Sequence, residues 1–129
     1  MKGKHIIIAG GTGFIGQGLV KYFGKENYIT ILSRQSVNSH NNSYQHTLLQ
    51  PAQGYNVTYR RWDGEHVEKH WAGEMEAADI VINLAGKSVN CRYTEKNKKE
   101  IFDSRTNSSK AIGDAIRQCV VPPKLWINA

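Results

Sequence analysis

The chain has 129 residues, of which 40% are apolar and 22% are charged, as in an ordinary soluble globular protein and unlike a disordered or fibrous one. This length suits one compact domain with a core of its own. The formal net charge of +6 is compatible with nucleic acid, an anionic membrane surface or a phosphorylated ligand, and charge alone does not choose among these partners.

The cysteines and the apolar runs indicate the cellular environment that we expect for the protein. Cys91 and Cys119 form no CxxC pair, and no secretory signal is present, so we expect a reduced, cytoplasmic protein without a disulfide framework. No segment approaches the roughly twenty apolar residues of a membrane span. We therefore expect no membrane partner.

The first elements alternate between strand and helix. Residues 4–9 form a β-branched run that stops at two glycines, which is typical of a buried parallel strand. Apolar residues at helical spacing predict a helix over 14–23, and Gly24 is expected as its left-handed C-terminal cap. A second apolar strand is predicted over 28–33.

The alternation continues through the rest of the chain. We expect a long polar loop over 34–53, strands over 57–62 and 79–84, a weak helix over 65–76, and a helix over 95–118. Pro122 and Pro123 would end that helix before a fifth strand over 125–128. This order predicts an α/β fold, a doubly wound parallel sheet of the Rossmann type, truncated after about the fifth strand.

A glycine-rich turn carries the clearest chemical signal. Residues 10–16, Gly-Gly-Thr-Gly-Phe-Ile-Gly, satisfy both GxGxxG and the wider GxxGxxG spacing. In a dinucleotide fold such glycines permit a tight turn, a close approach of backbone to pyrophosphate, and close packing of helix on strand. The position between a predicted strand and a predicted helix favours this interpretation over a turn without a ligand.

The end of the second strand indicates which cofactor is bound. An acidic residue there would bind the ribose hydroxyls of NAD, whereas a basic one accommodates the 2′-phosphate of NADP. Ser33 and Arg34 stand at this place, without an acid. We expect NADP, with NAD as the alternative; Arg34 could also be an ordinary surface arginine.

Three motifs follow one another along the chain: the glycine turn, Ile-Leu-Ser-Arg at 31–34 and Ile-Asn-Leu-Ala-Gly-Lys-Ser at 82–88. With these motifs the chain resembles the extended short-chain dehydrogenase/reductases, and most closely their atypical branch, the NAD-dependent epimerase-family proteins. Arg-Tyr-Thr-Glu-Lys at 92–96 and Asp-Ser-Arg at 103–105 favour the narrower assignment.

The resemblance implies cofactor contacts by position. The glycine turn and first helix turn would bind the pyrophosphate, through Gly10, Gly13, Phe14, Ile15 and Gly16. Ser33 and Arg34 would hold the 2′-phosphate, and Asp63 the adenine, unless Asp63 is only a strand-end cap. Leu84, Ala85 and Gly86 would run beside a ribose of the cofactor, unless 85–86 are simply a turn. Asn83, within the fourth strand, could serve only to connect neighbouring loops.

Two departures from the family limit these expectations. Arg105 stands where many extended members have an asparagine, so its charge needs a loop carbonyl, a carboxylate or an anionic substrate as partner. No tyrosine of the chain is followed by lysine four residues later, so the catalytic Tyr-x-x-x-Lys is missing. We expect residues 1–129 to be an incomplete NAD(P)-binding domain, with no catalytic residue and without the C-terminal substrate lobe.

Other patterns point to structure. His66 and His70 have no apparent third metal ligand, and Trp62, Trp71 and Trp126 are interpreted as packing anchors. The lysines of residues 96–110 are expected to face solvent, without nucleic acid as a partner. The leading hypothesis is an NADP-dependent oxidoreductase or epimerase with an unknown small-molecule substrate. A non-catalytic NADP-binding sensor is the alternative, and a homodimer is left open.

Overall fold

The computed structural model describes residues 1–34, 55–86 and 94–129, which contain a five-stranded sheet flanked by helices. All neighbouring strands run parallel, in the order β3-β2-β1-β4-β5. The strands are β1 (His5–Ala9), β2 (Tyr28–Ser33), β3 (Asn56–Arg61), β4 (Ile80–Asn83) and β5 (Leu125–Asn128). The helices are α1 (Phe14–Phe23), α2 (Lys69–Ala72) and α3 (Glu95–Arg117), and a 3₁₀ turn, η3 (Gly73–Met75), follows α2. The predicted Rossmann-type α/β fold is confirmed.

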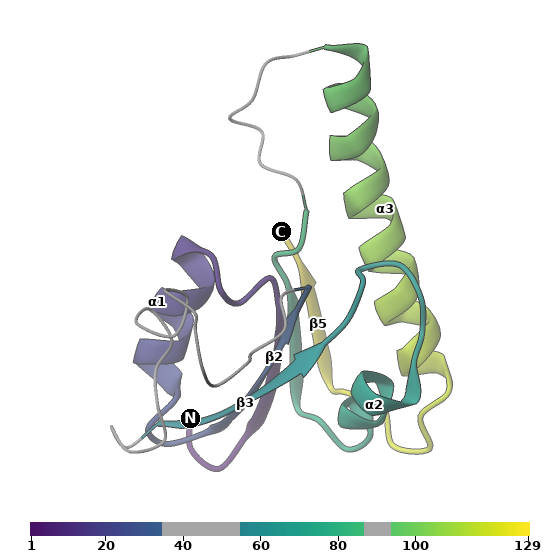
Figure 1. Ribbon diagram of the computed structural model, residues 1–129. Coiled ribbons are helices and arrows are strands. Elements are labelled where there is room, and N and C mark those ends of the chain that lie inside the picture. The colour runs from purple at the N-terminus through teal and green to yellow at the C-terminus, as the bar shows by residue number, and fades with distance from the viewer. Residues whose placement is uncertain (35–54, 87–93) are drawn as a thin grey trace.

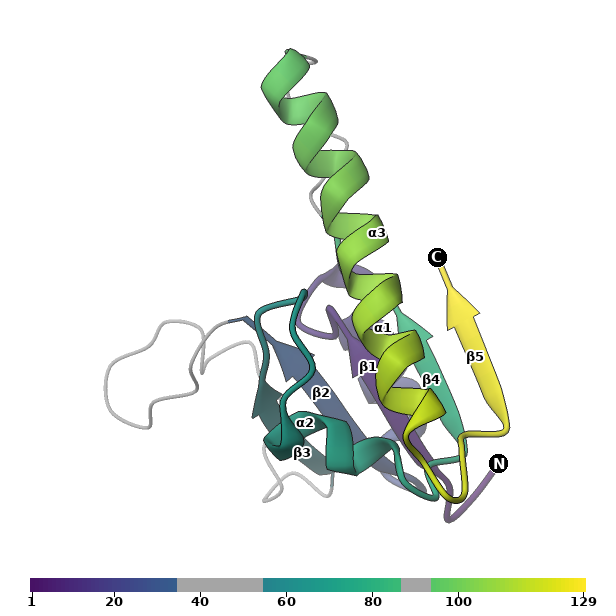
Figure 2. The ribbon, with the colours of Figure 1, turned by 90° about the vertical axis from the view of Figure 1, so that its right-hand side faces the viewer.

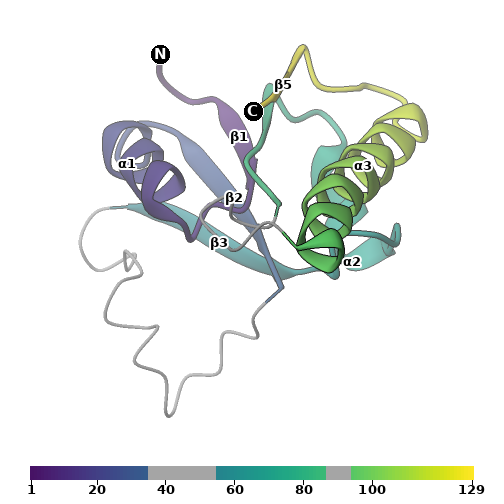
Figure 3. The same ribbon diagram turned by 90° about the horizontal axis from the view of Figure 1, so that it is seen from above.

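The molecule has three layers, with α1 on one face of the sheet and α2 and α3 on the other (Figure 1, Figure 3). The apolar residues of β1 do not alternate with polar ones, and the packing of this strand explains why. Ile6 and Ile8 belong to the core beneath α1, whereas Ile7 and Ala9 belong to the core beneath α2 and α3. A central parallel strand is covered on both faces, so the consecutive residues 6–9 are all apolar.

The larger core contains the aromatic anchors. Trp62 and Trp71 meet edge to face, with ring centroids 5.4 Å apart, and Trp71 is completely buried. Trp126 lies outside this core and is 39% exposed, but its ring packs against α3, since a Cβ on Gly113 would lie 3.3 Å from it. All three tryptophans therefore pack against other elements, as expected, and burial of the rings of Trp62 and Trp71 contributes strongly to the stability of a small domain.

Two predicted details are wrong. Gly24 is right-handed (φ −70°, ψ −18°), and it is glycine for lack of space, because a Cβ there would lie 2.5 Å from the carbonyl oxygen of Val20. The helix expected over 65–76 shrinks to α2 and η3. Asp63 accepts hydrogen bonds from the backbone N–H groups of Glu65 and His66, which places a turn where the helix was expected to begin.

The long helix α3 has a side-chain cap at its N-terminus and ends before the proline pair. Thr94 caps it by accepting a hydrogen bond from the backbone N–H of Asn97. It ends at Arg117, five residues before Pro122, so the proline pair lies in the connection to β5 and does not terminate the helix directly. Lys96, Lys98, Lys99 and Lys110 are exposed, as predicted.

Some expectations lie outside the described residues. These are most of the loop predicted over 34–53, and Lys87, Ser88, Arg92 and Tyr93 of the family motifs. Of the helices in the described ranges, none is long and apolar enough to span a membrane.

Candidate functional site

A cleft of about 760 Å³ lies at the carboxyl edge of the sheet, where β1, β2, β3 and β4 all end. Strand β1 sits in the middle of the sheet, so the chain leaves it toward β2 on one side and returns later to β4 on the other. Ligands of open α/β sheets bind in the crevice at such a reversal of strand order. The cleft is lined by Gly10, Thr12, Gly13, Leu32, Ser33, Arg34, Trp62, Asp63, Gly64, Glu65, Leu84, Ala85, Gly86, Glu100, Asp103, Ser104, Asn107 and Ser108.

Two glycines of the turn after β1 are required by the fold itself. Gly10 has φ +76°, and a Cβ there would lie 2.8 Å from the backbone carbon of Leu84. Only glycine combines that conformation with so close an approach of two loops. At Gly16 a Cβ would lie 2.4 Å from the Cα of Gly11, so α1 starts in direct contact with the turn. The structure thus brings the loops after β1 and β4 together.

Gly13 is different, because nothing inside the protein requires a glycine there. It is exposed, its φ is −75°, and a Cβ would meet only the carbonyl oxygen of Gly10 at an ordinary 3.6 Å. Gly13 precedes the first turn of α1, whose N–H groups have no partner within the helix, and it has no side chain to cap them. Its missing side chain leaves open space in the cleft beside those donors.

The expected residues of this first helix turn do not all line the cleft. Phe14 and Ile15 have strongly exposed side chains, 94% and 63% accessible, and neither belongs to the cleft lining. Only their backbone N–H groups can face an anion at the helix N-terminus.

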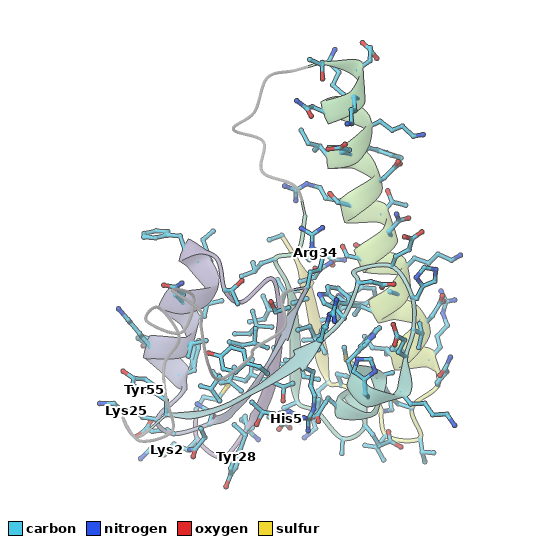
Figure 4. All side chains as sticks on the ribbon, in the orientation of Figure 1. Lys2, His5, Lys25, Tyr28, Arg34 and Tyr55 are labelled. Carbon is cyan, nitrogen blue, oxygen red and sulfur yellow. The ribbon has the colours of Figure 1, made fainter. Side chains whose placement is uncertain are left out.

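Ser33 ends β2 and Arg34 follows it, and both line the cleft. Ser33 is buried and its backbone carbonyl accepts a hydrogen bond from the N–H of Trp62, which joins the ends of β2 and β3. Arg34 is exposed at the edge of the sheet opposite to Tyr28 and His5 (Figure 4). Within the described ranges, its guanidinium has no hydrogen bond or ion pair. The cleft therefore holds a cation that is available to a ligand.

Asp63 serves the loop after β3. One carboxylate oxygen accepts the two backbone hydrogen bonds at 2.8 and 2.7 Å, and the other accepts one from the ring Nδ1 of His66 at 2.5 Å. The backbone hydrogen bond from His66 is the largest cause that lowers the pKa of Asp63 to about 2. The hydrogen bond to Asp63 in turn raises the pKa of His66. Asp63 thus has the capping role that the sequence left open.

Asn83 organises the loop after β4. Its buried side-chain oxygen accepts a hydrogen bond from the backbone N–H of Ala85 at 3.0 Å, and its amide donates to Ser108, Ser109 and Asn128. One side chain thereby connects β4, α3 and β5. Leu84, Ala85 and Gly86, which line the cleft, are held in place by this connection.

Arg105 lies behind the same loop and outside the cleft lining. Its Nη1 donates to the backbone carbonyl of Ala129 at 3.1 Å, and its aliphatic part packs on Gly86, where a Cβ would lie 3.3 Å from Cγ. Of the partners considered from sequence, the structure places a backbone carbonyl beside Arg105.

The sequence analysis did not predict that α3 forms one wall of the cleft. Its cleft-lining residues are Glu100, Asp103, Ser104, Asn107 and Ser108. These positions follow the i, i+3, i+4, i+7, i+8 spacing of one helix face and are all polar, so a polar stripe along the helix was the available signal. Among the described residues, no group of three or more histidine, cysteine or acidic side chains could hold a metal ion, and His70 contacts the carbonyl of Arg61.

Solved structures share this fold at low sequence identity. The UDP-N-acetylglucosamine 4-epimerase of Methanobrevibacter ruminantium, in complex with UDP-N-acetylmuramic acid, matches with a TM-score of 0.70 and 21% identity over 94% of this chain and 36% of that one. A variant UDP-glucuronic acid 4-epimerase of Bacillus cereus matches with a TM-score of 0.72 and 15% identity, covering 96% and 39% of the two chains. A short-chain dehydrogenase of Oenococcus oeni matches with a TM-score of 0.68 and 21% identity, covering 98% and 61%.

Relatives with higher sequence identity indicate the family of the chain. An epimerase family protein of Staphylococcus saprophyticus is 34% identical over 127 residues, which cover 98% of this chain and 37% of that protein. The epimerase family protein YfhF of Bacillus subtilis is 32% identical over 126 residues, covering 97% and 37%. The chain thus spans 37% of the length of each of these relatives. The family model described as "NAD dependent epimerase/dehydratase family" matches residues 6–128, and the chain belongs to that family.

Proposed function

We propose that this chain binds NADP(H) and forms the cofactor-binding domain of an epimerase-like oxidoreductase. Gly13 is the observation that carries the proposal, because it is an exposed glycine that the fold does not need. A missing side chain beside the free N–H groups of a helix suits the close approach of a pyrophosphate. Gly10 and Gly16 shape this cradle, and the amides of Phe14 and Ile15 complete it.

Arg34 supports NADP over NAD. No acidic residue ends β2, and the free guanidinium there can make charge-assisted hydrogen bonds to a 2′-phosphate, with the Ser33 hydroxyl beside it. The loop of Asp63 would flank the adenine, and Leu84, Ala85 and Gly86 would flank a ribose. The bound cofactor supplies hydride chemistry, whereas these residues bind and orient it.

Turnover would depend on groups that this chain does not supply. None of its tyrosines precedes a lysine by four residues, and the matched relatives are much longer. We propose that the catalytic tyrosine and lysine, and the lobe that selects a sugar-nucleotide or other small substrate, lie outside these residues. NADP binding without turnover in the intact protein would instead support a sensor.

Calorimetric titration with NADP⁺ and NAD⁺ tests the proposal. We expect Gly13→Ala to weaken both cofactors at least about tenfold, because the methyl group blocks the pyrophosphate. Gly18→Ala is the matched control: it lies in the same helix with nothing within 4 Å of an added Cβ, and it should leave binding unchanged.

Arg34→Glu separates the two cofactors. Replacing a phosphate-binding cation by an anion should weaken NADP⁺ by about 100-fold and NAD⁺ far less. Equal losses for both would contradict the 2′-phosphate assignment. Failure of the unmodified protein to bind either dinucleotide would overturn the proposed function as a whole.

A further inference from the structure

The junction between the glycine turn and α1 lacks the two contacts that usually fix such a junction. Gly13 is the N-cap residue, and it has no side chain to bond the first N–H groups of the helix. In many helices an apolar residue before the N-cap packs against the fourth helical residue and fixes the angle at which the chain enters. Here those two positions are occupied by Thr12 and Gln17, which are both polar.

A hydrogen bond joins these two residues in place of the apolar contact. The side-chain Nε2 of Gln17 donates to the backbone carbonyl of Thr12 at 2.9 Å, so the side chain spans the first turn of α1. At the other end of the same peptide group, the N–H of Gly13 donates to the carbonyl of Gly10 at 3.2 Å. Both polar atoms of the peptide group between Thr12 and Gly13 are therefore bonded, which fixes the orientation of the peptide plane.

Gln17 acts on the cleft through Thr12. Thr12 and Gly13 line the cleft, whereas Gln17 is half-buried and does not belong to the lining. In Figure 2, α1 lies behind the sheet, and α3, which forms the opposite wall of the cleft, lies in front of it. A ligand in the cleft thus meets the glycine turn, and Gln17 supports that turn from the side of α1.

The turn needs this support because it is rich in glycine. Gly10, Gly11 and Gly13 have more conformational freedom than other residues. On the proposed function, Gly13 must also lack a side chain so that a pyrophosphate can approach. Backbone N–H groups bind an anion well when they already point toward it, because ordering a loose loop on binding lowers the affinity. A bond from outside the turn can supply this order without occupying the cleft.

We propose that Gln17 is a positioning residue, which fixes the orientation of the glycine turn against α1 and thereby preorganises the binding of the pyrophosphate. The inference rests on the proposed function, in which the pyrophosphate lies beside Gly13 and the N–H groups at the start of α1. The bond from Gln17 also holds the carbonyl oxygen of Thr12. This oxygen has a partial negative charge, which would repel a phosphate if it turned toward the cleft.

The test compares ligands with and without a pyrophosphate. Gln17→Met keeps the length of the side chain and its helix propensity but removes the donor. We expect this variant to weaken NADP⁺ and NAD⁺ by the same factor of about five, and to leave the affinity for adenosine 2′-monophosphate unchanged, because that nucleotide has no pyrophosphate. Gln17→Ala loses the same bond and should give the same pattern. Gly18→Ala, the control, should change none of the three affinities.

Amide hydrogen exchange in the protein without ligand gives a second measurement. The N–H of Gly13 should exchange about fivefold faster in Gln17→Met, because its bond to the carbonyl of Gly10 opens more often. Amides of the central strand β1 should exchange at the rate of the unmodified protein. A variant that only destabilised the whole domain would accelerate exchange at both places and would weaken all three ligands.

The outcomes separate this inference from the proposed function. If the dinucleotides bind but Gln17→Met leaves their affinities unchanged, or weakens adenosine 2′-monophosphate to the same extent, the inference is wrong and the proposed function stands. If the unmodified protein binds neither dinucleotide, the proposed function fails and the role of Gln17 fails with it.

Discussion

The two edges of the sheet carry polar clusters of opposite character. At the amino edge, a shallow groove of about 580 Å³ contains His5, Thr30 and Glu74. The Thr30 hydroxyl lies 2.8 Å from Nε2 of His5 and donates to Glu74 at 3.3 Å, and Glu74 accepts a further hydrogen bond from Arg60 at 3.1 Å. At the carboxyl edge, Arg34, Asp103 and Asn107 line a larger cleft and have no such partners among the described residues. Figure 4 shows His5 and Arg34 at these opposite ends.

The comparison indicates that a groove is a candidate binding site when its polar side chains have no partners within the protein. The amino-edge network satisfies its own donors and acceptors, so it stabilises the sheet and offers a ligand little in exchange for desolvation. The carboxyl edge keeps a cation, a carboxylate, an amide and a helix N-terminus unmatched. Substitutions at the two edges should therefore affect different measurements.

The largest effect is expected at the glycine turn. Gly16→Ala places a methyl group 2.4 Å from backbone of Gly11, which cannot be relieved by a side-chain movement. We expect a loss of about 3 kcal/mol in the free energy of unfolding, measured by urea denaturation, together with weaker cofactor binding. Gly18→Ala in the same helix should be stabilising by about 0.5–1 kcal/mol, and a similar loss at both positions would contradict the steric argument.

A smaller effect is expected at the amino edge. Thr30→Val keeps the shape of a side chain that is 2% exposed but removes the hydroxyl between His5 and Glu74. We expect a loss of about 1–2 kcal/mol in unfolding free energy and unchanged NADP⁺ affinity. A loss of affinity without a loss of stability would show that this groove also serves a ligand.

The smallest effect concerns pH at the loop of Asp63. Its pKa of about 2 lies below the ordinary 3.8, so its contribution to stability is present above about pH 4 and is lost as pH falls toward 2. The raised pKa of His66 has the opposite sense: its contribution is present below the ordinary 6.5 and is lost as pH rises through the folded-state value. The pair should thus stabilise most between about pH 4 and 6.5.

Denaturation of the protein and of His66→Ala checks this at three pH values. The difference in unfolding free energy should be greatest near pH 5 and should shrink at pH 2 and at pH 8. Because both groups are exposed, the difference remains small. A difference that grows toward pH 8 would show that the assigned pKa directions are wrong.

Much of the fold could be predicted because its signals are local. Uninterrupted apolar runs such as Ile6–Ile8 are required of central parallel strands, and the glycine turn identifies the first βα unit. The conformation of Gly24 could not be predicted, because the reason for that glycine is the nearby ring of Tyr55 and the carbonyl of Val20. Likewise α2 is short because the side chain of Asp63 accepts hydrogen bonds from the backbone and forms a turn there. The spacing of apolar residues, from which a helix is predicted, gives no sign of this turn.

Only one side of the cleft lining was predicted from the sequence. Gly10, Gly13, Ser33, Arg34, Asp63 and residues 84–86 lie at or just after strand ends, and the carboxyl ends of parallel strands meet at one edge. Asp103 and Asn107 lie in the middle of α3, and they reach the cleft because of the way in which α3 packs on the sheet. The hydrogen bonds by which Asn83 connects β4, α3 and β5 could not be predicted either, because the sequence does not show that these three elements meet.

The length of α3 has a mechanical consequence for the cleft. All of its fully buried residues lie between Ser108 and Ala115, whereas the first half of the helix extends past the sheet (Figure 1). Ser108 meets Asn83, and Arg105 adds a contact with Gly86 and a hydrogen bond to Ala129. At a rise of about 1.5 Å per residue, Asp103 lies about 7.5 Å along the axis from Ser108, and a tilt of about 10° about that residue would shift Asp103 by roughly 1.3 Å. The width of the cleft beside Asp103 thus depends on the angle between α3 and the sheet.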